Sequence, residues 1–189
     1  MGFNISWLAF KGCERSSVLK RVGLVANGVV SDYPKGMECG SALPDNGYLL
    51  FLNHPKHAFT QPSKLDVLSA ECEIVGCQVQ EFNTSSAVFY WKNGVRIWSV
   101  VHDAEKNIRN LEIIGSPPAE LESLRHEANK LQDLERKPFS FFGLGGLRLD
   151  HFVDVPIDLA TKLVGYNHSK IIQPWGVAKY EILELASLQ

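Results

Sequence analysis

The sequence lacks an excess of charge of either sign, and it lacks any long hydrophobic run. Its 19 basic and 21 acidic residues are spread along the chain and give a formal net charge of -2. Without a basic surface to attract phosphate groups, nucleic-acid binding is not expected. The apolar patch at residues 7–10 is too short for a signal peptide, and nothing approaches the roughly 20 apolar residues of a membrane span. We therefore expect a cytoplasmic protein that binds neither nucleic acid nor a membrane.

Cysteine is scarce, and its spacing does not favour a metal site. The four cysteines are Cys13, Cys39, Cys72 and Cys77. Cys72 and Cys77 lack the two-residue spacing and the nearby histidine of a zinc site, so no metal is expected. In a reducing compartment all four should be free thiols. Cys13 lies close to Lys11 and Arg15, which would suit a nucleophile, but a tolerated small residue at a helix entry is the alternative.

The composition is that of a folded globular protein. Hydrophobic residues make up 45% and charged residues 21% of the 189 residues, so a packed core is expected. We predict one α+β domain over residues 1–189, built on a mixed or antiparallel sheet of about five to seven strands with about four helices. The order of elements at the start is predicted to be β-α-β-α. No cofactor-binding motif is present, and no cofactor is expected.

Apolar runs and turn residues locate the expected elements. Strands are predicted at residues 4–10, 48–52, 73–82, 87–91, 95–102, 111–114, 152–155 and 180–185. Helices are predicted at residues 16–22, after Pro62, from Pro117 to about residue 136, and at 156–164. Residues 27–47 are rich in turn residues and are interpreted as a surface loop available for binding. Residues 139–146 are apolar but rich in glycine, and they are not assigned to an element.

The dipeptide Asn93-Gly94 gives the strongest local signal. It lies between two apolar strands and suits the type I′ turn of a β-hairpin. Strict alternation would place Arg96, Trp98 and His102 on the same face of the second strand.

Three histidines are the weak candidates for acid-base chemistry. His54 and His57 follow an apolar strand, where enzymes built on open sheets sometimes keep catalytic groups. His102 precedes Asp103, but neighbouring strand residues point to opposite faces, which argues against an acid-base pair. The alternative for all three is an ordinary surface or strand-end histidine.

Tryptophans are the candidates for contact with a partner. Trp7 and Trp98 lie in predicted strands and should belong to the core. Trp91 lies beside the hairpin turn and Trp175 lies in a Pro-Trp-Gly loop, so these two are the better candidates for a binding surface.

The segment from Ile5 to Gly12, followed by Val18-Leu19 and Gly23-Leu24, resembles the start of a family of bacterial proteins with no established activity. The likeness extends to the stretch 73–77, the hairpin 91–103 and the segment 111–118, about two thirds of the chain in all. The resemblance implies a bacterial, cytoplasmic protein and assigns no site residue.

The lack of a catalytic motif favours a non-catalytic protein that binds another protein. An immunity protein that neutralises a bacterial toxin is one such function. A small enzyme with His54, His57 or His102 in acid-base roles is the first alternative, since active sites often assemble from residues far apart in the sequence. A subunit or scaffold of a larger assembly is the second.

Overall fold

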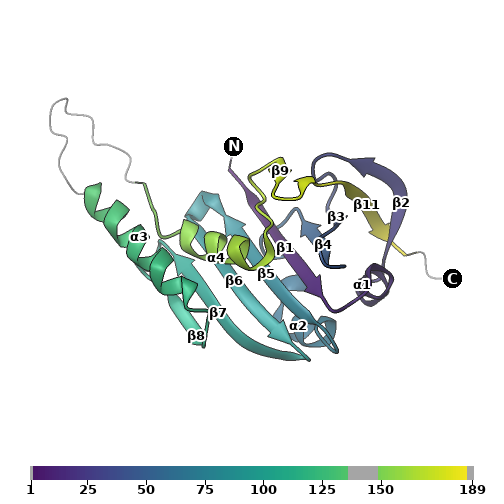
Figure 1. Ribbon diagram of the computed structural model, residues 1–189, viewed down its shortest axis with the longest axis horizontal. Coiled ribbons are helices and arrows are strands. Elements are labelled where there is room, and N and C mark those ends of the chain that lie inside the picture. Colours follow the sequence, from purple (N-terminus) through teal and green to yellow (C-terminus); the bar gives the residue numbers. More distant parts are fainter. Residues whose placement is uncertain (1, 136–148, 187–189) are drawn as a thin grey trace.

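An antiparallel sheet of nine strands organises the molecule (Figure 1). The computed structural model describes residues 2–135 and 149–186. Within them the strand order is β2-β11-β3-β4-β1-β5-β6-β7-β8, and a second sheet pairs β9 with β10. The strands are β1 (Asn4–Lys11), β2 (Leu24–Ser31), β3 (Glu38–Ala42), β4 (Tyr48–Leu52), β5 (Glu73–Gln80), β6 (Ser85–Lys92), β7 (Val95–Asp103), β8 (Glu112–Gly115), β9 (Ile172–Gln173), β10 (Gly176–Val177) and β11 (Tyr180–Leu185).

Helices lie on both faces of the large sheet. They are α1 (Arg15–Val22), α2 (Pro62–Leu68), α3 (Glu120–Leu134) and α4 (Asp154–Val164). Helices α1 and α2 pack on one face, and α3 and α4 pack on the other. The predicted α+β class with about four helices is confirmed for the described residues, whereas the predicted number of strands is too low.

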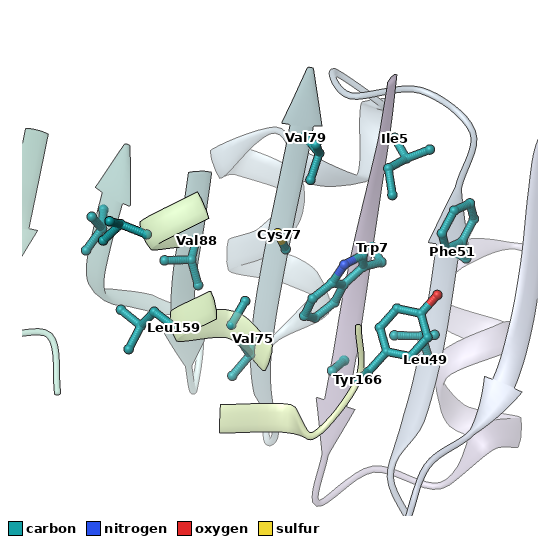
Figure 2. Close-up of a cluster of buried hydrophobic side chains, with 14 of the residues drawn as sticks. Ile5, Trp7, Leu49, Phe51, Val75, Cys77, Val79, Val88, Leu159 and Tyr166 are labelled. Carbon is teal, nitrogen blue, oxygen red and sulfur yellow. The ribbon is translucent and has the colours of Figure 1, made fainter. Parts of the chain in front are cut away.

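The α3/α4 face carries the larger core cluster (Figure 2). Trp7 of β1 is 1% exposed and meets Tyr166 edge to face, with 5.4 Å between ring centroids and 89° between ring planes. Cys77 and Val88, from β5 and β6, continue this layer toward Leu159 of α4. An alternating strand sends every second side chain to the same face, so Trp7 belongs to this cluster while its neighbour Leu8 belongs to the other.

On the α1/α2 face, a polar link joins distant segments. The hydroxyl of Tyr48 donates to Glu181 Oε1 at 2.7 Å, and Arg15 Nε donates to the same oxygen at 2.6 Å. Burial raises the pKa of Glu181, but the hydrogen bonds from Arg15 and Tyr48 outweigh burial and the net pKa is lowered. The Tyr48 ring lies directly over Gly40, where any Cβ would overlap the phenol oxygen. Gly40 is therefore required for the close approach of β3, β4 and β11.

Residues 27–47 are not a surface loop, which corrects the sequence-based interpretation. Most of β2 and all of β3 lie in this segment, so the chain opens β-α-β-β-β-α instead of β-α-β-α. The turn residues that suggested a loop lie instead at a register shift within β2 and at the turn between β3 and β4. Asn27 and Gly28 fall where the pairing of β2 with β11 shifts register. Asp45 and Asn46, with φ of 59° and 57°, form the tight turn between β3 and β4.

The predicted hairpin is confirmed, with one change of face. Asn93 and Gly94 have φ of 51° and 78°, as a type I′ turn requires. The pairing of β6 with β7 shifts at Tyr90/Trp91, so Trp91 pairs with Arg96 while Tyr90 pairs with Trp98. This bulge carries Arg96 to the α2 face, where its guanidinium lies 5.6 Å from the Trp91 ring centroid. The alternation prediction is therefore wrong for Arg96.

Of the elements predicted in the C-terminal part of the chain, one is not found, and the short strands β9 and β10 were not predicted. Helices α3 and α4 and strand β11 are found close to their expected positions, and α4 ends at Gly165, whose φ is 79°. Residues 152–155 are not a strand, because α4 already begins at Asp154. The glycine-rich stretch 139–146 lies outside the described residues.

We expect Gly40→Ala to destabilise the fold by about 1–3 kcal/mol, because the new methyl group would displace the Tyr48 ring. Urea denaturation of Gly40→Ala, Tyr48→Ala and the double variant measures the free energy of unfolding. The double variant should cost at least ~1 kcal/mol less than the sum of the single variants. Strictly additive costs would contradict the close contact.

Candidate functional site

A polar cavity of about 200 Å³ lies at the end of strands β5, β6 and β7. Pro55 and Lys56, from the loop after β4, form one wall, and Gln78, Gln80 and Asp103 line it from the sheet. The cavity therefore brings the loop that carries His54 and His57 to the strand end that carries His102.

Strand register places the polar side chains of the cavity side by side. Gln80 of β5 pairs with Ser85 of β6, and Ser85 pairs with Asp103 of β7. Residues opposite each other in antiparallel strands share a face, so these three form a row across the sheet. In the next row, Gln78 is followed by Ala87 and then by Val101.

Hydrogen bonds tie the overlying loop to the sheet. Ser6 Oγ, on β1, donates to the carbonyl oxygen of His54 at 2.8 Å. Gln78 Nε2 donates to Thr60 Oγ1 at 2.8 Å, and Thr60 Oγ1 donates to the carbonyl oxygen of His57 at 2.8 Å. These contacts are to backbone and neutral groups, so they hold the cavity wall in place without adding charge.

The two loop histidines have structural contacts. His57 Nδ1 accepts the backbone N–H of Phe59 at 3.2 Å, so the ring proton of the neutral form is on Nε2, which lies 3.0 Å from Glu38 Oε1. His54 Nδ1 accepts the backbone N–H of Lys56 at 3.1 Å, and its ring is exposed. Within the described residues, neither imidazole forms a hydrogen bond with a serine, threonine or cysteine side chain.

His102 is the centre of a buried ion pair. Its ring has no exposed surface, and its Nε2 lies 2.8 Å from Asp150 Oδ2. Its Nδ1 lies 2.8 Å from the carbonyl oxygen of Asn110. Asp150 also accepts the backbone N–H of Phe152 on its other oxygen, at 2.9 Å. Both partners of His102 are acceptors, so the arrangement suits an imidazolium that donates from both nitrogens.

Burial and hydrogen bonding act in opposite directions on His102. Burial lowers its pKa, but hydrogen bonds to Asp150 and to the Asn110 carbonyl, together with the negative charges of Asp150 and Asp103, raise it. The net pKa is raised from the ordinary value of 6.5. The charged form of His102 is therefore favoured in the folded protein.

His102 has no nitrogen left to serve as a general base. Ser86 lies opposite it on β6, which gives a serine, a histidine and an aspartate on neighbouring elements. A catalytic triad needs one imidazole nitrogen on the serine and the other on the aspartate. Here the second nitrogen faces the Asn110 carbonyl, and Ser86 Oγ donates to the Val153 carbonyl at 2.6 Å. The trio fixes the segment before α4 to the sheet.

The cysteines are free thiols buried in the two core clusters. Burial raises the pKa of Cys39 and of Cys72 to about 12, and it raises that of Cys77 further. A thiol acts as a nucleophile through its thiolate, which such shifts disfavour. Cys13, the best-placed candidate in the sequence, is only 8% exposed.

The two tryptophans expected at a binding surface differ in position. Trp91 is 3% exposed and its Nε1 donates to Asp66 Oδ1 at 2.8 Å, so it belongs to the core and not to a surface. Trp175 is half-buried against the α3/α4 core, with its ring over Gly165. Trp7 and Trp98 are core residues, as predicted.

Asp150 is the site residue that sequence reasoning missed. It lies 48 positions after His102, beyond α3 and the glycine-rich stretch, and no local pattern links the two. Among residues 2–135 and 149–186, no cluster of three or more histidine, cysteine, aspartate or glutamate side chains could hold a metal ion. No helix in this part of the chain is long and apolar enough to cross a membrane.

Comparisons of the chain with protein-family models, curated proteins and solved structures found no match. The resemblance to a bacterial family therefore stays a prediction, and the site is interpreted from its own geometry.

The His102–Asp150 pair should make stability depend on pH. Folding raises the pKa of His102. The His102–Asp150 pair therefore contributes fully to the free energy of unfolding below the unfolded pKa of His102, near 6.5, and this contribution is lost as pH rises through the folded pKa. We expect His102→Gln to cost about 3 kcal/mol at pH 6, since it leaves Asp150 buried without its cation. That cost should fall steadily toward pH 9.

Urea denaturation between pH 5.5 and 9 checks this expectation. His126→Gln is the matched control, because His126 is exposed on α3. Its effect should stay small at every pH. A cost for His102→Gln that does not vary with pH would show that folding does not raise the pKa of His102.

Proposed function

We propose that this protein is a non-catalytic binding protein whose partner is another protein, and that the partner contacts the outer edge of β2 and the turn after it. The observation that carries the proposal is the exposure of large apolar side chains along this edge. Val29, Val30, Tyr33 and Met37 are each more than half exposed. Exposed apolar side chains beside an unpaired strand edge often mark a protein interface.

The backbone of β2 supports the same assignment. Strand β2 is the first in the order of the large sheet and pairs only with β11. Among the described residues, its outer side has no neighbouring strand, so backbone groups there are available to pair with an added strand. The register shift interrupts the ladder between Ala26 and Val30, so β2 pairs regularly with β11 at residues 24–26 and again at Val30 and Ser31.

The charges near this edge largely compensate one another. Lys179 forms an ion pair with Asp32, and the Lys35 ammonium lies 4.6 Å from the centroid of the Tyr33 ring. A partner would therefore be held by apolar contacts and strand pairing more than by a field of one sign.

The candidate catalytic groups support binding over catalysis. His102 has both ring nitrogens engaged, and His57 is held by Glu38. The three cysteines with raised pKa values are poor nucleophiles. An immunity protein that blocks a toxin is one form of the proposed function, and a subunit of a larger assembly is another.

Two matched variants test the proposed surface. Val30→Lys places a charge on the β2 edge, and Val67→Lys makes the same change on α2, where Val67 is similarly exposed at 65% against 62% for Val30. Tagged wild-type and variant chains are incubated with lysate of the native cells, and bound proteins are quantified by mass spectrometry. Isothermal titration calorimetry with the purified partner then gives the affinity.

We expect one protein to bind the wild-type chain and Val67→Lys alike, and Val30→Lys to weaken that binding at least tenfold, about 1.4 kcal/mol. The thermal midpoints of both variants should stay close to the wild type, which separates binding from folding. Proteins recovered equally with both variants, or none with either, would sink the proposal. Self-association lost in Val30→Lys would assign the edge to a homo-oligomer instead.

A further inference from the structure

The cavity at the end of β5, β6 and β7 interrupts an otherwise apolar sheet face. Toward α1 and α2 this face carries Leu8, Phe10, Ile74 and Phe89. At the end of the same strands, the register replaces them with the row formed by Gln80, Ser85 and Asp103. Gln78, Gln80, Ser85 and Asp103 are each partly exposed, so their polar groups can bond to a molecule that enters the cavity.

Several polar groups of the cavity have bonding capacity to spare. Within residues 2–135 and 149–186, neither the Lys56 ammonium nor the side-chain amide of Gln80 has a protein partner. Asp103 accepts the backbone N–H of Glu105 on Oδ1 at 3.1 Å, and its Oδ2 has no hydrogen bond among those residues. Gln78 donates from Nε2 to Thr60, which leaves its amide oxygen as an acceptor.

The charges on opposite sides of the cavity restrict the chemistry of the occupant. Lys56 is on the loop after β4, and Asp103 is at the end of β7. The Lys56 ammonium has no protein partner among the described residues, whereas Asp103 also interacts with the charges of His102 and Lys106 and has Oδ2 free for a further hydrogen bond. A molecule with a carboxylate and an ammonium group satisfies both charges.

The volume restricts the size of the occupant. A cavity of about 200 Å³ holds about seven water molecules at roughly 30 Å³ each. It is smaller than the ~300–1,000 Å³ pockets that take drug-sized ligands. A free amino acid with a short polar side chain fits this volume.

We propose that this cavity binds a small zwitterion, a free α-amino acid with a short polar side chain. Lys56 holds the α-carboxylate, Asp103 holds the α-ammonium group, and the amides of Gln78 and Gln80 bond to the side chain. The loop held by Ser6 and Thr60 supplies Lys56 without rearrangement. This site is separate from the β2 edge and does not depend on the proposed function.

Titration of the ¹⁵N-labelled protein with L-serine, L-asparagine and L-glutamine tests the proposal by NMR. We expect at least one of them to shift the side-chain amide signals of Gln78 and Gln80 and the backbone signals of Lys56 and Asp103 in a saturable manner. Ethanolamine, which lacks the carboxylate, and acetate, which lacks the ammonium group, should bind at least tenfold more weakly.

Charge-neutral variants separate this site from general surface effects. Lys56→Met and Asp103→Asn should each weaken binding about tenfold, because each removes a charge-assisted hydrogen bond. Lys64→Met and Glu105→Gln are the matched controls, since both side chains are exposed and do not line the cavity. They should bind like the wild type.

Three results would overturn the proposal. One is the absence of saturable shifts at the cavity up to about 10 mM amino acid, a concentration that would fill any site with a millimolar dissociation constant. Another is equal binding by Lys56→Met and the wild type. The third is binding of ethanolamine or acetate as tightly as the amino acid. Val30→Lys should keep the amino-acid response, so failure of the β2 edge assignment and failure of this one are distinguishable.

Discussion

The burial of both faces of the central strands is the constraint on which the rest of this structure depends. All five residues of β4 are buried, and so are residues 5–10 of β1. A sheet that is apolar on both faces must be covered on both. Helix α1 follows β1 and helix α2 follows β4, so the helices of one layer are close in sequence to the strands that they cover. The other layer comes from α3 and α4, much later in the sequence, and must be brought back to the sheet.

The buried pair of His102 and Asp150 performs that second task. It joins the end of β7 to the segment that leads into α4, and Ser86 adds a hydrogen bond to the Val153 carbonyl. Gln132 of α3 strengthens the same junction through bonds to the backbone of Leu149 and His151. Chemistry that resembles a catalytic site in composition therefore serves to attach a helix layer, because every donor and acceptor in it already has a partner.

The two proposed sites lie where the helices no longer cover both faces of the sheet. At the β2 edge the part of the sheet that the structure describes has no further strand, and apolar side chains are left in solvent. At the end of β5, β6 and β7 the α2 layer is replaced by a loop, and the sheet face changes from apolar to polar. The first surface suits a protein and the second suits a small charged molecule, since apolar edges and polar cavities recognise different partners.

The sequence by itself determined the elements whose signal is local. The hairpin turn at Asn93, the helix after Pro118 and the strand at the C-terminal end were predicted because turn geometry and side-chain periodicity act over a few residues. Only the tertiary structure decided the strand order, the use of residues 27–47 as strands, and the neighbours of His102 and Lys56. These depend on contacts between residues far apart in the chain. Asp150 is 48 positions from His102, and nothing in either local sequence specifies the other.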